Sequence, residues 1–176
     1  MAKSLPLNLF GSEPLLKTSG IAIVLAGVLE DDGKKEEAYK VYKEALWQLQ
    51  SAYVDHPPDT QPDYLNTEAL KLLSASERIR IAALAYKLSS MASELGKPEE
   101  EEEKWLLCSV DAIYTVLIEE MEGSEAAQIP RPPRAKKLNI MATDMRLPSW
   151  ASHHDLAAPF EVLGTMYKNR PRESRS

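Results

Sequence analysis

Residues 22–46 read AIVLAGVLEDDGKKEEAYKVYKEAL, and residues 85–110 read AYKLSSMASELGKPEEEEEKWLLCSV. Each stretch consists of a helical pattern, a glycine (Gly33 or Gly96) and a second helical pattern. Aligning the two glycines makes small, apolar and aromatic positions coincide: Leu25 with Leu88, Ala26 with Ser89, Tyr42 with Trp105 and Ala45 with Cys108. A small residue on one helix admits a bulky side chain from its partner, so the pattern predicts two helical hairpins of one design.

The helical pattern continues over most of the chain, and glycine and proline interrupt it. We expect helices over residues 19–31, 36–54, 65–73, 74–95, 99–121 and 150–169, with Ser74 and Glu77 capping the fourth and Gly123 closing the fifth. The first is expected to begin at Ser19 as N-cap and to bury one apolar face: Ile21, Val24, Leu25, Val28 and Leu29. The fold class is all-α, a solenoid of helical hairpins with about six or seven helices and insertions between repeats.

The domain organisation follows from the proline- and glycine-rich stretches. Residues 1–18 form an irregular leader, 19–170 a helical domain and 171–176 a tail. Within the domain, units cover 19–54, 65–122 and 150–170, and a proline-rich linker covers 123–149. The last unit holds a single helix, in which we expect Phe160 and Leu163 to be buried against the helix at 99–121.

Composition excludes several classes of protein. The chain has 176 residues, a net charge of −6 and one cysteine. An acidic chain is a poor nucleic-acid binder, and a lone cysteine excludes a disulfide framework. The apolar run at 19–29 is too short to cross a bilayer; it is either a buried helix or, as the alternative, a signal-peptide core.

The sequence holds no recognisable catalytic or metal-binding set. His153 and His154 are adjacent, so on a helix they point about 100° apart and suit one metal ion poorly, and His56 lies in a distant loop. Cys108 occupies a small-residue packing position and is expected to be a buried, inert thiol. Glycine-rich phosphate loops, nucleophile elbows and zincin motifs are absent from the sequence. We therefore expect no enzyme activity, no cofactor and no metal.

The spacings resemble those of the tetratricopeptide repeat (TPR), a helical hairpin of about 34 residues. The signatures are Ala38-x-x-x-Tyr42-x-x-Ala45 and Phe160-x-x-Leu163-Gly164-x-x-Tyr167. Two features depart from the pattern: Glu101 replaces a small residue in the second unit, and Gly96 lies 63 positions after Gly33 rather than about 34. The alternative is a generic antiparallel helical bundle whose small residues match by chance.

A closer resemblance covers residues 18–170. The stretch LSASERIRIAALAYKLSSMASELGKPEEEEEKWLLCSVDAIYTVL (73–117) looks like the central region of a mitochondrial TPR family, and TSGIAIVLAGVLEDDGKKEEAYKVYKEAL (18–46) and HHDLAAPFEVLGTMYKNR (153–170) are also similar. That family includes the fungal TPR subunit of the adaptor for the inner-membrane i-AAA protease and an animal relative tied to respiratory complex III. Its members carry a transmembrane anchor ahead of the repeats; we expect this chain to be a soluble fragment that does not itself span the membrane.

The resemblance implies a non-enzymatic adaptor on the mitochondrial inner membrane, facing the intermembrane space. It would recruit polypeptide substrates to the protease or hold the complex together. The alternative is a structural assembly factor of a membrane complex, such as a respiratory complex, acting through its convex or acidic surface. Residues 99–103 supply five successive carboxylates, which either favour a helix N-terminus or form a docking surface. The basic stretch 131–137 is either a solvated linker or a contact for that acidic helix or for anionic lipid.

TPR arrays bind extended peptides along the first helices of their hairpins, and the family pattern transfers this role to particular positions. The peptide-binding residues implied are Ile23, Glu30, Tyr86, Lys87, Ser90, Glu94, Glu161 and Lys168. TPRs that clamp acidic chaperone tails use Lys and Asn where this chain has Ile23 and Gly27, which cannot donate to a carboxylate. The groove therefore suits apolar or unfolded segments, unless the leader or a neighbouring helix covers Ile23. An unpaired last helix also suggests a homodimer through the C-terminal helix.

Overall fold

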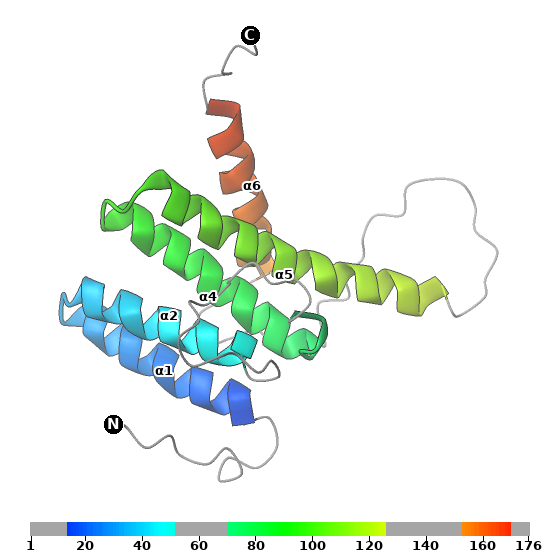
Figure 1. Cartoon of the computed structure of the whole chain (residues 1–176), viewed down its shortest axis with the longest axis horizontal. Helices are drawn as coiled ribbons and strands as arrows, with labels where there is room; N and C mark the ends of the chain where they lie inside the picture. The colour runs from blue at the N-terminus through cyan, green and yellow to red at the C-terminus, as the bar shows by residue number, and fades with distance from the viewer. Residues whose placement is uncertain (1–13, 52–69, 126–152, 170–176) are drawn as a thin grey trace.

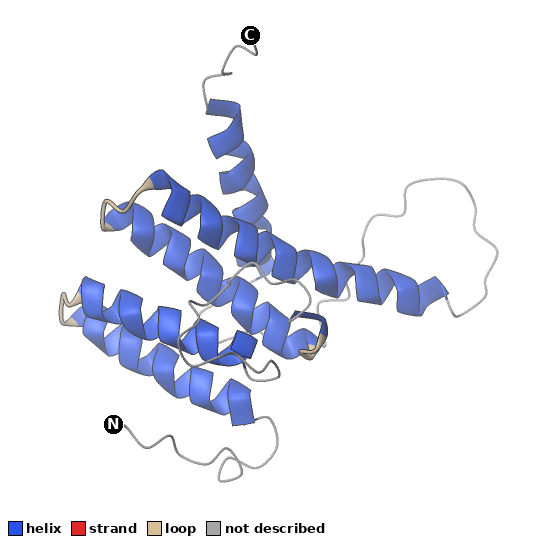
Figure 2. Cartoon of the chain, in the orientation of Figure 1, coloured by secondary structure: helices blue, strands red, loops and turns tan. Residues whose placement is uncertain are grey.

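The computed structural model describes residues 14–51, 70–125 and 153–169 (Figure 1). These residues form the helices α1 (Pro14–Asp31), α2 (Lys35–Ser51), α4 (Ala75–Glu94), α5 (Glu99–Glu125) and α6 (His153–Asn169). Helices and short turns account for the described ranges, which contain no strand (Figure 2). The all-α fold class is thus confirmed. The leader up to residue 13, most of the expected helix at 65–73, most of the linker and the tail lie outside the described residues.

Both hairpin turns have the same backbone structure. Gly33 and Gly96 take positive φ angles of 76° and 64°. The Gly33 N–H donates to the Glu30 carbonyl at 2.9 Å, and the Lys34 N–H donates to the Leu29 carbonyl at 2.8 Å. The second turn repeats this pair of bonds, with Gly96 donating to Ser93 at 3.1 Å and Lys97 to Ala92 at 2.9 Å. Each turn is therefore a Schellman motif, which ends the first helix and reverses the chain.

Alanine at either turn glycine is expected to lower the free energy of unfolding by about 1–2 kcal/mol, because L residues are strained at positive φ. The space for a Cβ is open at Gly33 and Gly96, so the cost comes from the backbone alone. Gly164→Ala is the matched control: it lies inside α6 in open space and should gain about 0.5–1 kcal/mol. Urea unfolding measures all three; stabilisation at either turn would contradict the assignment.

The helices pack as two antiparallel pairs placed side by side. In Figure 1, α1, α2, α4 and α5 follow one another in chain order from the bottom upward. The main contacts join α1 to α2 and α4 to α5, α2 packs against α4, and α6 lies across α5 with a smaller contact to α4. Small residues that are at most 1% exposed lie at the helix contacts: Ala26, Ala38, Ala45, Ala85 and Cys108. They let the helices approach closely, as the hairpin alignment predicted.

Of the five residues expected on the buried face of α1, Leu29 packs against the core and the other four do not. Ile21, Val24, Leu25 and Val28 are between 52% and 69% exposed. The packed side instead carries Leu15, Ser19, Ile23 and Ala26, two of which are small. Nearly the whole circumference of α1 is apolar or small, so periodicity located an apolar stripe without showing which side faces α2. Ser19 accordingly lies inside the helix rather than at its N-cap, since α1 begins at Pro14, and residues 14–18 of the expected irregular leader are helical.

The remaining boundaries are largely as predicted. Ser74 caps α4: its hydroxyl accepts from the Glu77 N–H at 3.3 Å, and its own N–H donates to the Glu77 carboxylate at 2.8 Å, which completes the capping box. Gly123 does not close α5, which continues to Glu125. In α6, Leu163 is buried as expected, but Phe160 is 41% exposed, because Leu163 and Pro159 occupy the side that packs on the other helices.

Candidate functional site

Two of the predicted binding residues, Glu30 and Lys87, meet between the hairpins. Glu30 lies at the end of α1, and its carboxylate accepts from Lys87 Nζ of α4 at 2.7 Å. The Tyr42 hydroxyl donates to the same carboxylate at 2.7 Å. Burial raises the pKa of Tyr42 well above its ordinary value, and the nearby Glu30 charge adds to this. This group therefore joins α1, α2 and α4 through one half-buried carboxylate.

A strip of α4 continues from this group towards the solvent. Glu94 accepts from Lys35 Nζ at 2.8 Å, and this bond raises the pKa of Lys35 and lowers that of Glu94. Ser90 is exposed and Tyr86 half-buried on the same side of α4, since residues four and eight apart share a helix face. The strip presents an aromatic ring, a hydroxyl and paired charges, which are groups that can contact an extended polypeptide.

The other predicted positions do not join this strip. Ile23 is 7% exposed and belongs to the packed side of α1, so it is part of the core rather than of a binding surface. Glu161 and Lys168 are exposed on α6, which packs on α5 and α4. The predicted set therefore divides into a core residue, a strip on α4 and a separate surface on α6.

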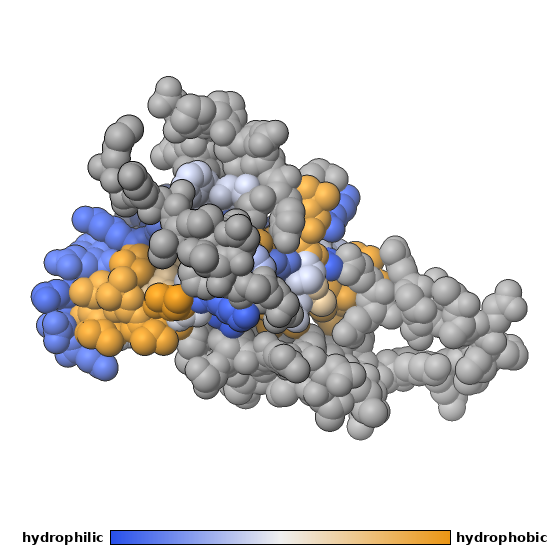
Figure 3. All heavy atoms as spheres, turned by 90° about the horizontal axis from the view of Figure 1, so that it is seen from below, coloured by the Kyte–Doolittle hydropathy of each residue, from blue (hydrophilic) through white to orange (hydrophobic). Residues whose placement is uncertain are grey.

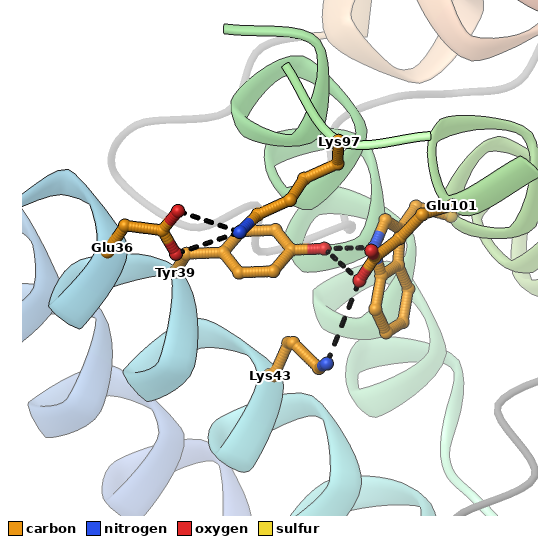
Figure 4. Close-up of polar contacts among 6 residues, drawn as sticks. Glu36, Tyr39, Lys43, Lys97 and Glu101 are labelled. Atoms are coloured by element: carbon orange, nitrogen blue, oxygen red, sulfur yellow. Dashed lines mark hydrogen bonds and ion pairs between the residues drawn. The ribbon is translucent and has the colours of Figure 1, made fainter. Parts of the chain in front are cut away.

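A network of aromatic and charged side chains connects the two hairpins near their turns (Figure 4). Trp105 Nε1 of α5 donates to the Tyr39 hydroxyl of α2 at 2.6 Å, and that hydroxyl donates to Glu101 Oε1 at 2.8 Å. Lys97 Nζ binds the Glu36 carboxylate at 2.7 Å and lies 5.8 Å from the centre of the Tyr39 ring. These contacts fix the second helix of one hairpin against the other hairpin.

This network assigns part of the acidic run at 99–103 a structural role. Glu101 accepts from Tyr39 and lies 3.7 Å from Lys43 Nζ, whose ammonium is 5.6 Å from the Tyr39 ring centre. The run also begins α5, where carboxylates are favoured by the helix dipole. Glu101, which departs from the small residue of the repeat pattern, is therefore used as a contact between hairpins.

Cys108 has the environment of a structural thiol. It is 1% exposed, and Gln50 Nε2 donates to its sulfur at 3.6 Å. Burial raises the pKa of the Cys108 thiol to about 12. A protonated, enclosed thiol is a poor nucleophile. Within the ranges that the structure describes, no group of three or more His, Cys, Asp or Glu side chains could hold a metal ion.

The raised pKa and the burial of Cys108 predict that thiol reagents react with it slowly. The folded chain should keep the thiol protonated above about pH 8.5, where an unfolded cysteine ionises, so rising pH favours unfolding through this group. We expect thiol reagents to modify Cys108 only as fast as the protein unfolds, with a rate that follows urea concentration. Ser93→Cys supplies an exposed thiol in the same fold as the control. Equal labelling rates for positions 93 and 108 in the native protein would contradict the burial.

The sequence reading missed an outward apolar surface on α1. We call Ile21, Val24, Leu25 and Val28 the α1 patch; Figure 3 shows a hydrophobic area on this underside, with hydrophilic residues along its left edge. Lys17, Gly20, Ile21 and Val24 line an open depression there. The apolar stripe was visible in the sequence. The helix has a second side, which carries the small residues Ser19 and Ala26 and can pack closely on another helix. That second side was the signal that α1 could bury a face other than the apolar stripe.

Comparison with protein-family models, with curated proteins and with solved structures found no match to this chain. The class of protein therefore rests on the fold and on the surfaces described above. Of the helices that the structure describes, none combines the length and the apolar character needed to cross a bilayer.

Proposed function

We propose that the protein is a non-enzymatic scaffold that binds other polypeptides through the first-helix side of a TPR-like array. The observation that carries the proposal is the repetition of one hairpin design. Two helix pairs end their first helices in the same Schellman motif and pack side by side through α2 and α4. Repeated helical hairpins offer extended surfaces, which such proteins use for binding rather than for chemistry.

The strip on α4 is the surface we assign to polypeptide binding. Tyr86 supplies apolar area, Ser90 an adaptable hydrogen bond, and the pairs Lys87–Glu30 and Glu94–Lys35 supply charges of both signs. An extended chain with apolar and polar residues can satisfy its backbone groups at such a surface. A single charged terminus would need a cluster of one sign, which the paired charges do not provide.

The resemblance to the mitochondrial TPR family supplies the proposed setting. There the chain recruits substrates to an inner-membrane protease, or holds its complex together, from the intermembrane-space side. The second candidate is an assembly factor of a membrane complex acting through its convex or acidic surface, where Glu101 already contacts Tyr39 and Lys43 and the other carboxylates of 99–103 would have to make the contact.

Binding is tested by fluorescence anisotropy with a labelled, permanently unfolded polypeptide that contains apolar segments. Ser90→Arg places a bulky side chain on the strip without touching the core and should weaken binding by about tenfold, equivalent to about 1.4 kcal/mol. Gln48→Arg, on the exposed side of α2, is the control and should bind as the parent chain does. Equal affinities for the two variants, or no binding by the parent, would refute the proposal.

A further inference from the structure

We propose that the α1 patch is a self-association surface, on which a second copy of this chain packs its own α1 antiparallel about a two-fold axis at Val24. This interface is separate from the α4 strip and would let one scaffold present two strips. It also differs from a dimer formed through α6. Four facts carry the inference: the exposure of the patch, its spacing, the charges at its ends and the open space at Gly27 beside it.

The spacing of the exposed residues is that of a helix–helix seam. Lys17, Ile21, Val24, Val28 and Asp31 are separated alternately by four and three residues. This spacing is the a/d repeat that aligns side chains along one side of a helix for contact with another helix. The three central members, Ile21, Val24 and Val28, are 61%, 69% and 55% exposed, so the seam is apolar and unoccupied by α2. Exposed patches of this kind mark sites of association.

The charges at the two ends of the seam favour a second copy of α1 as the partner and favour its antiparallel orientation. Lys17 is the basic end of the seam and Asp31 the acidic end, and Val24 lies midway between them. The two charges are about 21 Å apart along the helix at a rise of about 1.5 Å per residue. An antiparallel copy centred at Val24 brings Lys17 opposite the partner's Asp31 twice. A parallel copy would oppose like charges, so the patch is complementary to itself in one orientation only.

The helix dipole supports the same orientation. The first turn of α1 contains no acidic residue and the last turn no basic residue, so its charges do not favour its own dipole. In the antiparallel dimer the carboxyl end of the partner's α1, which carries a partial negative charge, lies beside Lys17. Lys17 therefore interacts favourably with the partner's dipole. Asp32 is paired with Lys34 at 3.2 Å, which leaves Asp31 as the carboxylate in line with the seam.

A glycine beside the seam allows the two helices to approach. In the antiparallel register Gly27 lies opposite the partner's Ile21, whereas a Cβ at Gly20 would lie 3.5 Å from the Arg80 guanidinium of the same molecule, so Gly20 adds no open space. Among the described atoms, a Cβ at Gly27 would meet nothing within 4 Å, so the space beside it is open. Large residues facing small ones interdigitate, as in other close helix contacts. One helix face is a small interface, so we expect a weak, concentration-dependent dimer rather than a permanent one.

The test is sedimentation equilibrium of the full chain, which measures its average mass in solution. Concentrations up to about 1 mM are used, so that a dimer with a Kd of up to about 1 mM is detected. We expect dimers for the parent. Val24→Asp, which opposes two carboxylates at the axis, should abolish them, and Asp31→Lys should weaken them by about tenfold. The double variant Lys17→Asp/Asp31→Lys restores both pairs and should recover dimerisation to within about threefold of the parent. Circular dichroism checks that each variant keeps the helical content of the parent.

Crosslinking gives a second readout of orientation. Val24→Cys should form a disulfide-linked dimer on mild oxidation, because the axis brings the two position-24 residues together, whereas native Cys108 is buried. Ser93→Cys, exposed on α4, is the control and should stay monomeric. A monomeric parent at every concentration would overturn the proposal, as would a dimer unaffected by Val24→Asp. Loss of the dimer in Phe160→Glu alone would assign the interface to α6 and would also overturn it.

Discussion

Replacing Trp105 with alanine is expected to lower the free energy of unfolding by about 3–5 kcal/mol, a large part of the stability of a small domain. The side chain is 0% exposed and lies in the core at the contact between α2 and α5. Its removal leaves a cavity, and it also removes the indole N–H that donates to the Tyr39 hydroxyl at 2.6 Å. Both losses act on the junction between hairpins, so the whole array should unfold at lower denaturant.

Two variants separate these effects. Trp105→Phe keeps most of the apolar volume and loses the hydrogen bond, so it should cost less than the alanine variant, about 1–3 kcal/mol. Tyr114→Ala, on the same helix with a ring that is 58% exposed, should change stability by less than about 0.5 kcal/mol. Chemical denaturation followed by circular dichroism measures all three. Similar losses for Trp105→Ala and Tyr114→Ala would show that the hairpins do not meet through Trp105.

Ile23→Ala is expected to cost about 2–4 kcal/mol, whereas Ile21→Ala should cost less than about 0.5 kcal/mol. The two residues have the same side chain and lie two positions apart on α1. Ile23 is 7% exposed on the side that packs, and Ile21 is 61% exposed on the α1 patch. The lost side chain therefore leaves a cavity in one variant and only solvated surface in the other. The pair measures directly which face of α1 is buried.

This comparison is made at low protein concentration, so that association through the α1 patch does not contribute to stability. A larger loss for Ile21→Ala than for Ile23→Ala would reverse the assignment and restore the face that the periodicity favoured. In that event the patch would not be exposed, and the proposed dimer would lose its basis. Equal small losses would mean that α1 does not pack on α2 as described.

The sequence predicted the turns, the helix cap and the buried hairpin positions, which depend on a few residues each. Gly33 and Gly96 marked the turns because positive φ favours glycine, and Ser74 with Glu77 marked the start of α4 because capping needs those side chains. The coincidence of Tyr42 with Trp105, and of Ala45 with Cys108, correctly predicted buried positions. Each of these features depends on a few neighbouring residues or on one pair of matched hairpins.

Features that depend on which neighbour is present could not be predicted in this way. The choice between the two apolar sides of α1 is made by α2, and the exposure of Phe160 by how α6 lies across α5. Gly123 lies within α5 because a glycine lowers helix stability by about 1 kcal/mol without ending a helix on its own. The contacts of Glu30 with Lys87 and Tyr42 join three helices, so no single spacing in the sequence reports them.

The polypeptide-binding role is tested most directly by site-specific photo-crosslinking to an unfolded polypeptide. A photoreactive residue is placed at Ser90 or Ser93, both exposed on the α4 side that carries the strip, and as a control at Lys40 on the exposed side of α2. We predict adducts from positions 90 and 93, competed by unlabelled polypeptide, and only background at position 40. Adducts of equal yield at all three positions, or none above background at 90 and 93, would contradict the proposed function.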